Sequence, residues 1–324
     1  MIIAKTPFRL SFCGGGSDLR NFYMQDYGAV VSSSIDKYMH IMIHDYFHDK
    51  IRIKYSKVED VDKVEDIKHP IVRECLKKVD IEKGIEIASI ADVPSGTGLG
   101  SSSSFTVCLL HALYTFKGVP VSKEKLASEA SEVEIDILKE PIGKQDQYAA
   151  SFGGLNFIRF NKDESVDTKP LMIKKEVKKK LEKNLLMFYF GNVRHASEIL
   201  SEQKSGITNK SKYDSIKKMV KLAEEFRSLL LKGKIEKIGE LLNLGWQLKK
   251  GLASNISNPS IDEYYHRGLE AGATGGKILG AGGGGFFLFF CPPQFQDNLR
   301  NELKLRELKF NLENDGSRII YKDG

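Results

Sequence analysis

A glycine- and serine-rich segment at residues 94–104, PSGTGLGSSSS, is well suited to binding an anion. Glycines adopt positive φ angles and let the backbone approach a ligand closely. An apolar segment of helical length, residues 105–116, follows directly, so the N–H groups and positive dipole end of a helix would face the same place. Serine hydroxyls bind phosphate oxygens or Mg²⁺, which prefers oxygen ligands. The pattern predicts a phosphate site, and a serine-capped surface loop is the alternative.

Two other glycine-based nucleotide motifs do not fit this chain. No Gly-Lys-Ser/Thr ends the segment, so it is not a Walker A loop. Residues 280–285, GAGGGG, match G-x-G-x-x-G, but an FFLFF run follows them. That run indicates a strand, whereas a Rossmann dinucleotide site requires a helix there. A dehydrogenase is therefore not predicted.

Alternating and apolar segments predict the elements that must position these loops. We expect strands over residues 1–12, 38–46, 51–55, 85–90 and 186–190, strands entered from glycine turns at 153–158 and 280–290, and helices over 56–83, 105–116, 122–139 and most of 196–252. The last 30 residues predict a helix and a short strand. The composition turns polar and lysine-rich at 161–184, which suggests a boundary. The sequence thus predicts an α+β protein with an ATP-binding domain, residues 1–165, and a C-terminal domain, residues 166–324.

The composition of the 324 residues, 41% hydrophobic and 28% charged, is that of a globular protein. The net charge of +6 comes from 49 basic and 43 acidic residues that are interspersed, which suits a small anionic substrate and not a nucleic-acid partner. The basic run at 174–180 predicts a solvated helix face. Four cysteines without paired spacing, no signal peptide and no apolar stretch of about 20 residues predict a cytoplasmic protein with no membrane partner.

Three segments that span nearly the whole chain resemble, in order, the motifs of the GHMP kinase superfamily, named for galactokinase, homoserine kinase, mevalonate kinase and phosphomevalonate kinase. They are residues 6–18 (TPFRLSFCGGGSD), 94–103 and 277–286 (KILGAGGGGF). The resemblance implies a two-domain α+β fold with ATP and its acceptor bound in the cleft between the domains. The residues that it implies for ATP binding are Pro94, Gly96, Gly98, Leu99, Gly100, Ser101, Ser102 and Ser103.

The resemblance also implies catalytic and metal-binding residues. Asp146 matches a catalytic aspartate that takes the proton of the attacking hydroxyl, and a helix N-cap is the alternative. Arg9 matches an arginine that faces the transferred phosphoryl group in the galactokinase-like branch, and a structural ion pair is the alternative. Ser102 and Glu134 match two Mg²⁺ ligands, with Glu132 as an alternative to Glu134.

The residues that the resemblance implies for acceptor binding are Gly15, Gly16, Ser17, Asp18, Gly282 and Gly283. Asp18 matches an aspartate that binds sugar hydroxyls. Galactokinases carry a Glu-His pair where this chain has Gly15 and Gly16, which disfavours galactose. For an acceptor that already carries a phosphate, Arg194 is the expected cation, and Lys249 with Lys250 is the second option.

The segments GGGSD and GKQDQYAA resemble the D-glycero-D-manno-heptose 7-phosphate kinases, which phosphorylate the anomeric hydroxyl for nucleotide-heptose and surface polysaccharide synthesis. We therefore predict a kinase that uses Mg²⁺ and ATP to phosphorylate this sugar phosphate. A fucokinase- or galactokinase-like enzyme of an unphosphorylated sugar is one alternative. A catalytically idle sugar-binding regulator is another, although the full set of implied catalytic residues favours an active enzyme. The sequence predicts no oligomeric state.

Overall fold

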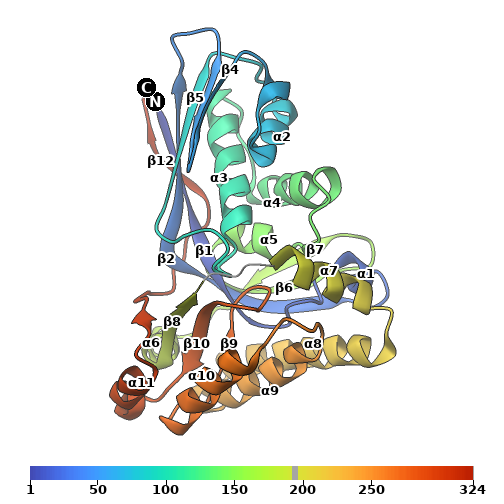
Figure 1. Cartoon of the computed structure of the whole chain (residues 1–324), viewed down its shortest axis with the longest axis vertical. Coiled ribbons are helices and arrows are strands. Elements are labelled where there is room, and N and C mark those ends of the chain that lie inside the picture. Colours follow the sequence, from blue (N-terminus) through green and yellow to red (C-terminus); the bar gives the residue numbers. More distant parts are fainter. Residues whose placement is uncertain (192–195, 324) are drawn as a thin grey trace.

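Two β-sheets and the helices packed on them build the protein, and the computed structural model describes residues 1–191 and 196–323 (Figure 1). Within these residues the first sheet has eight strands, in the order β12-β1-β2-β5-β3-β4, and β6 with β7 extends it from β2. They are β1 (Ile2–Cys13), β2 (Gly28–Asp45), β3 (Ile51–Lys54), β4 (Val58–Val61), β5 (Ile85–Ala91), β6 (Leu155–Phe160), β7 (Val166–Pro170) and β12 (Arg318–Lys322). The long strand β2 pairs with β6 along its first half and with β5 along its second half.

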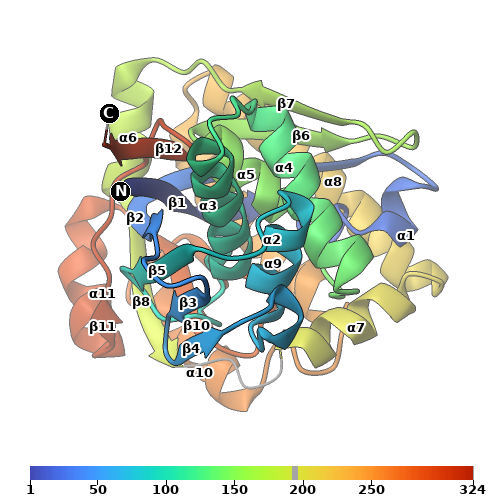
Figure 2. The same cartoon turned by 90° about the horizontal axis from the view of Figure 1, so that it is seen from above.

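The helices of the N-terminal half cover one face of this sheet (Figures 1 and 2). They are α2 (Pro70–Lys78), α3 (Ser101–Phe116), α4 (Lys123–Ser131) and α5 (Gln145–Phe152), and the short α1 (Arg20–Tyr23) follows β1. Helix α3 packs on β1 and β2 and is buried on almost all sides, because its residues between Phe105 and Tyr114 are mostly apolar. A helix this deeply buried is a rigid support for the loop that enters it.

The C-terminal half forms the second sheet and a layer of helices below the first sheet (Figure 1). The strands, in the order β11-β8-β10-β9, are β8 (Leu185–Gly191), β9 (Gly275–Ile278), β10 (Gly285–Phe290) and β11 (Arg306–Glu307). The helices are α6 (Lys175–Asn184), α7 (Ala196–Gly206), α8 (Lys210–Leu231), α9 (Ile238–Lys250), α10 (Pro259–Glu270) and α11 (Gln296–Leu303). Helices α8 and α9 pack on β1, where the rings of Phe12 and Phe226 stack with centroids 5.1 Å apart.

The chain ends beside its start, since β12 pairs with β1 and the Met1 ammonium contacts Asp323 at 2.5 Å. Strand β7, just after the predicted boundary at residue 165, also pairs into the first sheet through β6. The first sheet therefore takes strands from both sides of that boundary. The division at residue 165 stays a prediction.

Most predicted elements are confirmed, but the single helix expected over residues 56–83 is wrong. That segment holds strand β4 and, only from Pro70, helix α2. Proline is favoured at the first turn of a helix and fixes where this helix starts. Upstream, the carboxylate of Glu59 on β4 is buried and accepts hydrogen bonds from the backbone N–H groups of Lys68 and His69. The polar residues of this segment predicted an exposed helix. They belong instead to the edge strand β4 and to the connection between β4 and α2.

Candidate active site

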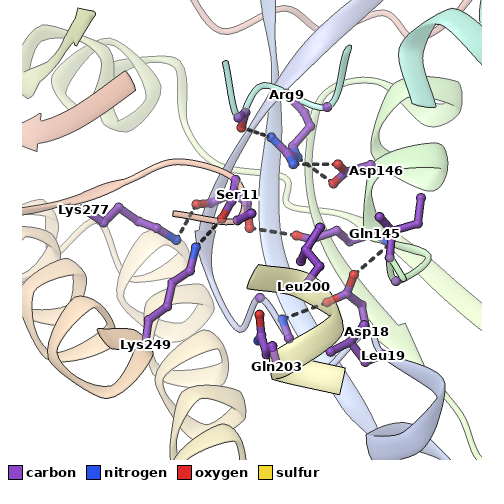
Figure 3. Close-up of a pocket in the computed structure, with 18 residues that line it drawn as sticks. Arg9, Ser11, Asp18, Leu19, Gln145, Asp146, Leu200, Gln203, Lys249 and Lys277 are labelled. Carbon is purple, nitrogen blue, oxygen red and sulfur yellow. Dashed lines mark hydrogen bonds and ion pairs between the residues drawn. The ribbon is translucent and has the colours of Figure 1, made fainter. Parts of the chain in front are cut away.

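A cavity of about 150 Å³ lies where the two halves of the chain meet (Figure 3). Strand β1 and the turn after it, the glycine loop before α3 and the start of α5 form its N-terminal walls, and α7, α9 and the β9–β10 turn form the others. Lining residues that sequence analysis predicts for the site are Arg9, Gly15, Gly16, Asp18, Gly98, Gly100 and Asp146. Residues from all three segments that resemble the GHMP kinases thus line one cavity.

The glycine loop ends at the N-terminus of α3, and its residues Gly98 and Gly100 line the cavity. Gly100 is the N-cap residue, with φ of 75° and therefore a left-handed conformation that favours glycine. It offers no side-chain oxygen, so it caps none of the free N–H groups of the first turn of α3. Pro94 and Gly96 lie exposed on the outer part of the loop, while Leu99 is buried and its carbonyl accepts from the Arg9 N–H at 3.1 Å. This arrangement is suited to binding phosphate oxygens.

Glu134 and Ser102 meet beside this loop. The Ser102 hydroxyl donates to the Glu134 carboxylate at 2.6 Å, and the Gln147 amide donates to its second oxygen at 2.7 Å. Glu134 lies in a π-helical turn after α4, is fully buried, and burial raises its pKa to about 7. The alternative candidate, Glu132, is half-exposed and pairs with Lys78 at 2.7 Å. Of the two glutamates, Glu134 is the one next to the predicted serine ligand.

The surroundings of Glu134 fit a magnesium ion. No lysine, arginine or histidine within residues 1–191 and 196–323 pairs with this buried carboxylate, so its charge has no cationic partner from the protein there. The Gln147 amide oxygen beside it is buried and accepts no hydrogen bond. Mg²⁺ binds oxygen ligands and commonly takes one or two carboxylates plus the phosphates of a nucleotide. The donors present are of that kind, and Ser103 is buried next to them in the first turn of α3.

Arg9 and Asp146 form a two-pronged ion pair at the cavity wall. Arg9 donates from Nε to one Asp146 oxygen at 2.7 Å and from its terminal nitrogen to the other at 2.6 Å. Its remaining terminal nitrogen donates to the Gly98 carbonyl at 2.6 Å. Asp146 lies in the first turn of α5, where Lys144 is the N-cap residue, so Asp146 is not the helix cap that the alternative required. Arg9 does form an ion pair, as the alternative expected, and its partner is the predicted catalytic aspartate, Asp146.

Asp18 forms the opposite polar wall. It is buried, and its carboxylate accepts from the Gly16 N–H at 2.8 Å and from the Gln145 N–H at 3.4 Å. Burial, and then the charge of Asp146, raise the pKa of this carboxyl. The absence of a side chain at Gly143 lets the backbone lie close to the Asp18 carboxylate, since a Cβ there would lie 2.1 Å from an Asp18 oxygen. A carboxylate held in this way can accept hydrogen bonds from hydroxyl groups of a ligand.

Some predicted residues lie away from the cavity walls. The Ser17 hydroxyl is buried behind the turn and bonds the backbone of Gly14 and Ala29. Gly282 and Gly283 pack against Ile256, with a 2.9 Å hydrogen bond from the Gly283 N–H, whereas their neighbours Gly280 and Ala281 line the cavity. Arg194 lies outside the described residues. Acceptor binding by these residues stays a prediction.

Several residues that line the cavity have no role predicted from the sequence: Ser11, Gln145, Leu200, Gln203 and Lys277. Lys249, the second option for binding a phosphate on the acceptor, also lines the cavity, although a helix lysine is by default exposed. A signal for Lys249 existed in the sequence, because it follows Leu242 and Trp246 at intervals of four and three residues, on the face of α9 that is buried. Lys277 had a weaker signal: it lies in the third motif, on a strand buried at every position.

The sequence of this chain matches two known domains, the GHMP kinase N-terminal domain at residues 67–154 and the GHMP kinase C-terminal domain at residues 226–306. A protein of Campylobacter jejuni named D-glycero-alpha-D-manno-heptose 7-phosphate kinase is 30% identical over 319 residues, 94% of this chain and 93% of the relative. The chain belongs to the GHMP kinase family, whose members use ATP as the phosphate donor. The prediction of an ATP-dependent kinase with this fold is confirmed.

Other relatives show how widely the fold is shared. A galactokinase of Thermococcus kodakarensis is 25% identical over 326 residues and covers 86% of each chain. The crystal structure of a protein of Bacteroides thetaiotaomicron titled D-glycero-D-manno-heptose 1-phosphate kinase superposes with a TM-score of 0.82, at 24% identity and over all of both chains. The mevalonate kinase of Methanococcus jannaschii gives 0.74 at 23% identity, covering 96% of this chain and 98% of its own. Such structural likeness supports the fold alone.

A search for membrane-crossing helices in the described part of the chain finds none that is long and apolar enough.

Proposed function

We propose that this protein transfers the γ-phosphoryl group of ATP to the anomeric hydroxyl of D-glycero-D-manno-heptose 7-phosphate, with Mg²⁺. The product would be the heptose 1,7-bisphosphate used for nucleotide-heptose and surface polysaccharide synthesis. Similarity over nearly the whole length to the Campylobacter jejuni heptose 7-phosphate kinase supports this substrate. The observation that carries the chemistry is the contact of Arg9 with both Asp146 and Gly98, since it joins a candidate base to the candidate phosphate loop.

The reaction needs positioning and charge neutralisation more than covalent chemistry. The glycine loop and the first turn of α3 would hold the phosphates of ATP. Asp146 would accept the proton of the attacking hydroxyl, since each of its oxygens keeps a lone pair besides the one that Arg9 uses. Asp18 and the side chains of Gln145 and Gln203 would bind sugar hydroxyls. Ser102 and Glu134 would hold Mg²⁺, which neutralises phosphate charge when bound.

A coupled assay of ADP release tests the proposal. The acceptors are heptose 7-phosphate, heptose 1-phosphate, the unphosphorylated heptose, L-fucose and D-galactose, each with and without Mg²⁺. We expect strong turnover on heptose 7-phosphate only when Mg²⁺ is present. Turnover on a free sugar alone would favour the fucokinase- or galactokinase-like alternative. Sugar binding in calorimetry without any ADP release would favour the idle regulator.

A further inference from the structure

Lys249 is a buried cation that faces the cavity from the last turn of α9. Only 6% of its surface is exposed, and its Nζ donates to the carbonyl of Gly280. A lysine ammonium has three N–H donors. Within the described residues this carbonyl is the hydrogen-bond acceptor found for it, so it has donors left for a ligand in the cavity (Figure 3).

The other two cations at the cavity make more hydrogen bonds to the protein than Lys249 does. Arg9 is paired with both oxygens of Asp146 and with the Gly98 carbonyl. Lys277 donates to the carbonyls of Ser11 at 2.9 Å and Phe12 at 3.1 Å, which holds it against β1. Because Asp146 neutralises Arg9 so directly, an incoming anion needs a further positive charge. Among the three side chains, Lys249 makes the fewest hydrogen bonds to the described residues.

The position of Lys249 relates it to the phosphate loop. Gly280, which accepts its hydrogen bond, packs so closely on Gly98 that a Cβ at residue 280 would lie 2.4 Å from the Gly98 Cα. Gly98 is also the residue whose carbonyl binds Arg9. Burial, followed by the charges of Lys277 and Arg9, lowers the pKa of Lys249 well below its ordinary value, and Asp18 and Asp146 act in the opposite direction. The negative charge of a bound phosphoryl group would raise this pKa again and favour the ammonium form. The ammonium therefore lies within electrostatic reach of the groups that line the reaction centre.

We propose that Lys249 is a catalytic residue whose ammonium binds the oxygens of the γ-phosphoryl group during its transfer; this rests on the proposed kinase function. In the transfer, the acceptor hydroxyl oxygen forms a bond to the γ-phosphorus. The bond from that phosphorus to the bridging oxygen breaks, its electron pair leaves with ADP, and the hydroxyl proton passes to Asp146. Lys249 keeps its protons and stabilises charge on the three equatorial oxygens.

This assignment differs from the expectation that Lys249 with Lys250 would bind the phosphate of the acceptor. In a heptose 7-phosphate, that phosphate is at the opposite end of the molecule from the anomeric hydroxyl. Lys249 is instead held next to Gly98, in the loop suited to the phosphates of ATP. Lys250 points elsewhere and pairs with Asp262 at 3.1 Å, which makes it a matched control.

The kinetic test compares Lys249→Met, Lys249→Gln and Lys250→Met. Loss of one preorganised donor to a transition state lowers kcat by roughly 10²–10³-fold, and we expect this for both Lys249 variants, with phosphorylated and unphosphorylated heptose alike. Glutamine can still donate to Gly280, so a purely structural role would be rescued by Lys249→Gln. Lys250→Met should keep the wild-type kcat. An unchanged kcat in the Lys249 variants, or a loss confined to KM for the phosphorylated acceptor, would overturn the assignment.

A second measurement does not depend on the acceptor. Calorimetry with Mg²⁺ gives the affinity for the non-hydrolysable analogue AMPPNP relative to that for ADP, which isolates contacts to the γ-phosphoryl group. Removing a hydrogen bond to a charged group should lower this ratio by about tenfold or more in Lys249→Met and leave it unchanged in Lys250→Met. An unchanged ratio in Lys249→Met would contradict the proposal. If the wild type releases no ADP with any sugar, the proposed function fails while this ratio still tests Lys249.

Discussion

Arg9 and Asp146, 137 positions apart in the chain, are joined by two hydrogen bonds of 2.7 and 2.6 Å, and a third bond of 2.6 Å ties Arg9 to the carbonyl of Gly98. One planar guanidinium thus fixes the distance between the aspartate at the start of α5 and the glycine loop before α3. Two groups that must act on one phosphoryl group gain from such a fixed geometry, since small misplacements cost large factors in rate.

Replacing the aspartate by asparagine removes the proton acceptor and keeps a similar shape. We expect Asp146→Asn to lower kcat by about 10²–10⁴-fold, the usual contribution of a positioned general base. Sugar binding should survive, because Asp18 and Gln145 still line the cavity. ADP release and calorimetry with the sugar measure the two effects separately. Unchanged turnover would show that Asp146 is not the base.

Replacing Arg9 by lysine keeps the positive charge but removes the planar guanidinium that makes three hydrogen bonds. An ammonium cannot donate to both oxygens of Asp146 and to the Gly98 carbonyl with the geometry of a guanidinium. We expect Arg9→Lys to reduce kcat by at least about 10²-fold, a loss similar to that of one transition-state donor. Steady-state kinetics with saturating ATP and acceptor check this. A variant with wild-type kcat would mean that charge alone, without the fixed geometry, is sufficient.

Glu134 and Glu132 provide a matched pair for the metal site. Glu134 is buried against Ser102, whereas Glu132 is half-exposed and pairs with Lys78. We expect Glu134→Gln to raise the Mg²⁺ concentration needed for half-maximal activity by about tenfold or more, since ligand and near-ligand changes cost about that much. Glu132→Gln should leave the Mg²⁺ dependence unaltered. The reverse pattern in a Mg²⁺ titration of ADP release would move the ligand to Glu132.

Lys277 predicts a pH dependence of stability. Burial lowers its pKa to about 8, so in alkaline solution the folded protein releases a proton that the unfolded chain still holds. The free energy of unfolding should therefore rise as pH increases from about 8 toward 10, by up to about 3 kcal/mol relative to Lys277→Met.

Chemical denaturation of both proteins across this pH range measures the difference. Lys57→Met, at an exposed position, controls for the loss of one positive charge. A pH-independent difference between the wild type and Lys277→Met would show that the ammonium does not lose its proton in the folded protein.

The glycine loop, with a strand before it and an apolar helix after it, could be predicted from the sequence, because each of these elements depends only on a local pattern. The resemblance to the GHMP kinases implied Ser102, Glu134, Asp146 and Arg9, and in the structure they contact one another in two pairs beside the glycine loop. That Arg9 pairs with Asp146 could not be predicted, since the contact depends on how β1 packs against α5. The same holds for Gln203, whose place at the cavity depends on α7.

Predictions from composition were wrong where tertiary contacts determine the structure of a charged segment. Residues 56–83 are charged enough to indicate an exposed helix, yet β4 pairs with β3 and Glu59 is buried as an acceptor for backbone N–H groups. Lys249 is the opposite case, a charged residue whose helical spacing with Trp246 places it on the buried face of α9. The spacing of Lys249 from Trp246 would have been a better guide to this buried face than its residue type.

The most direct test of the central claim is to identify the product by NMR after incubation with Mg²⁺, ATP and heptose 7-phosphate. We expect a second phosphate monoester whose phosphorus couples to the anomeric proton, with the 7-phosphate intact and one ADP formed for each product. With Asp146→Asn the product should form at least about 10²-fold more slowly. A new phosphate coupled to any other proton, or no new phosphorus signal despite bound ATP and sugar, would contradict it.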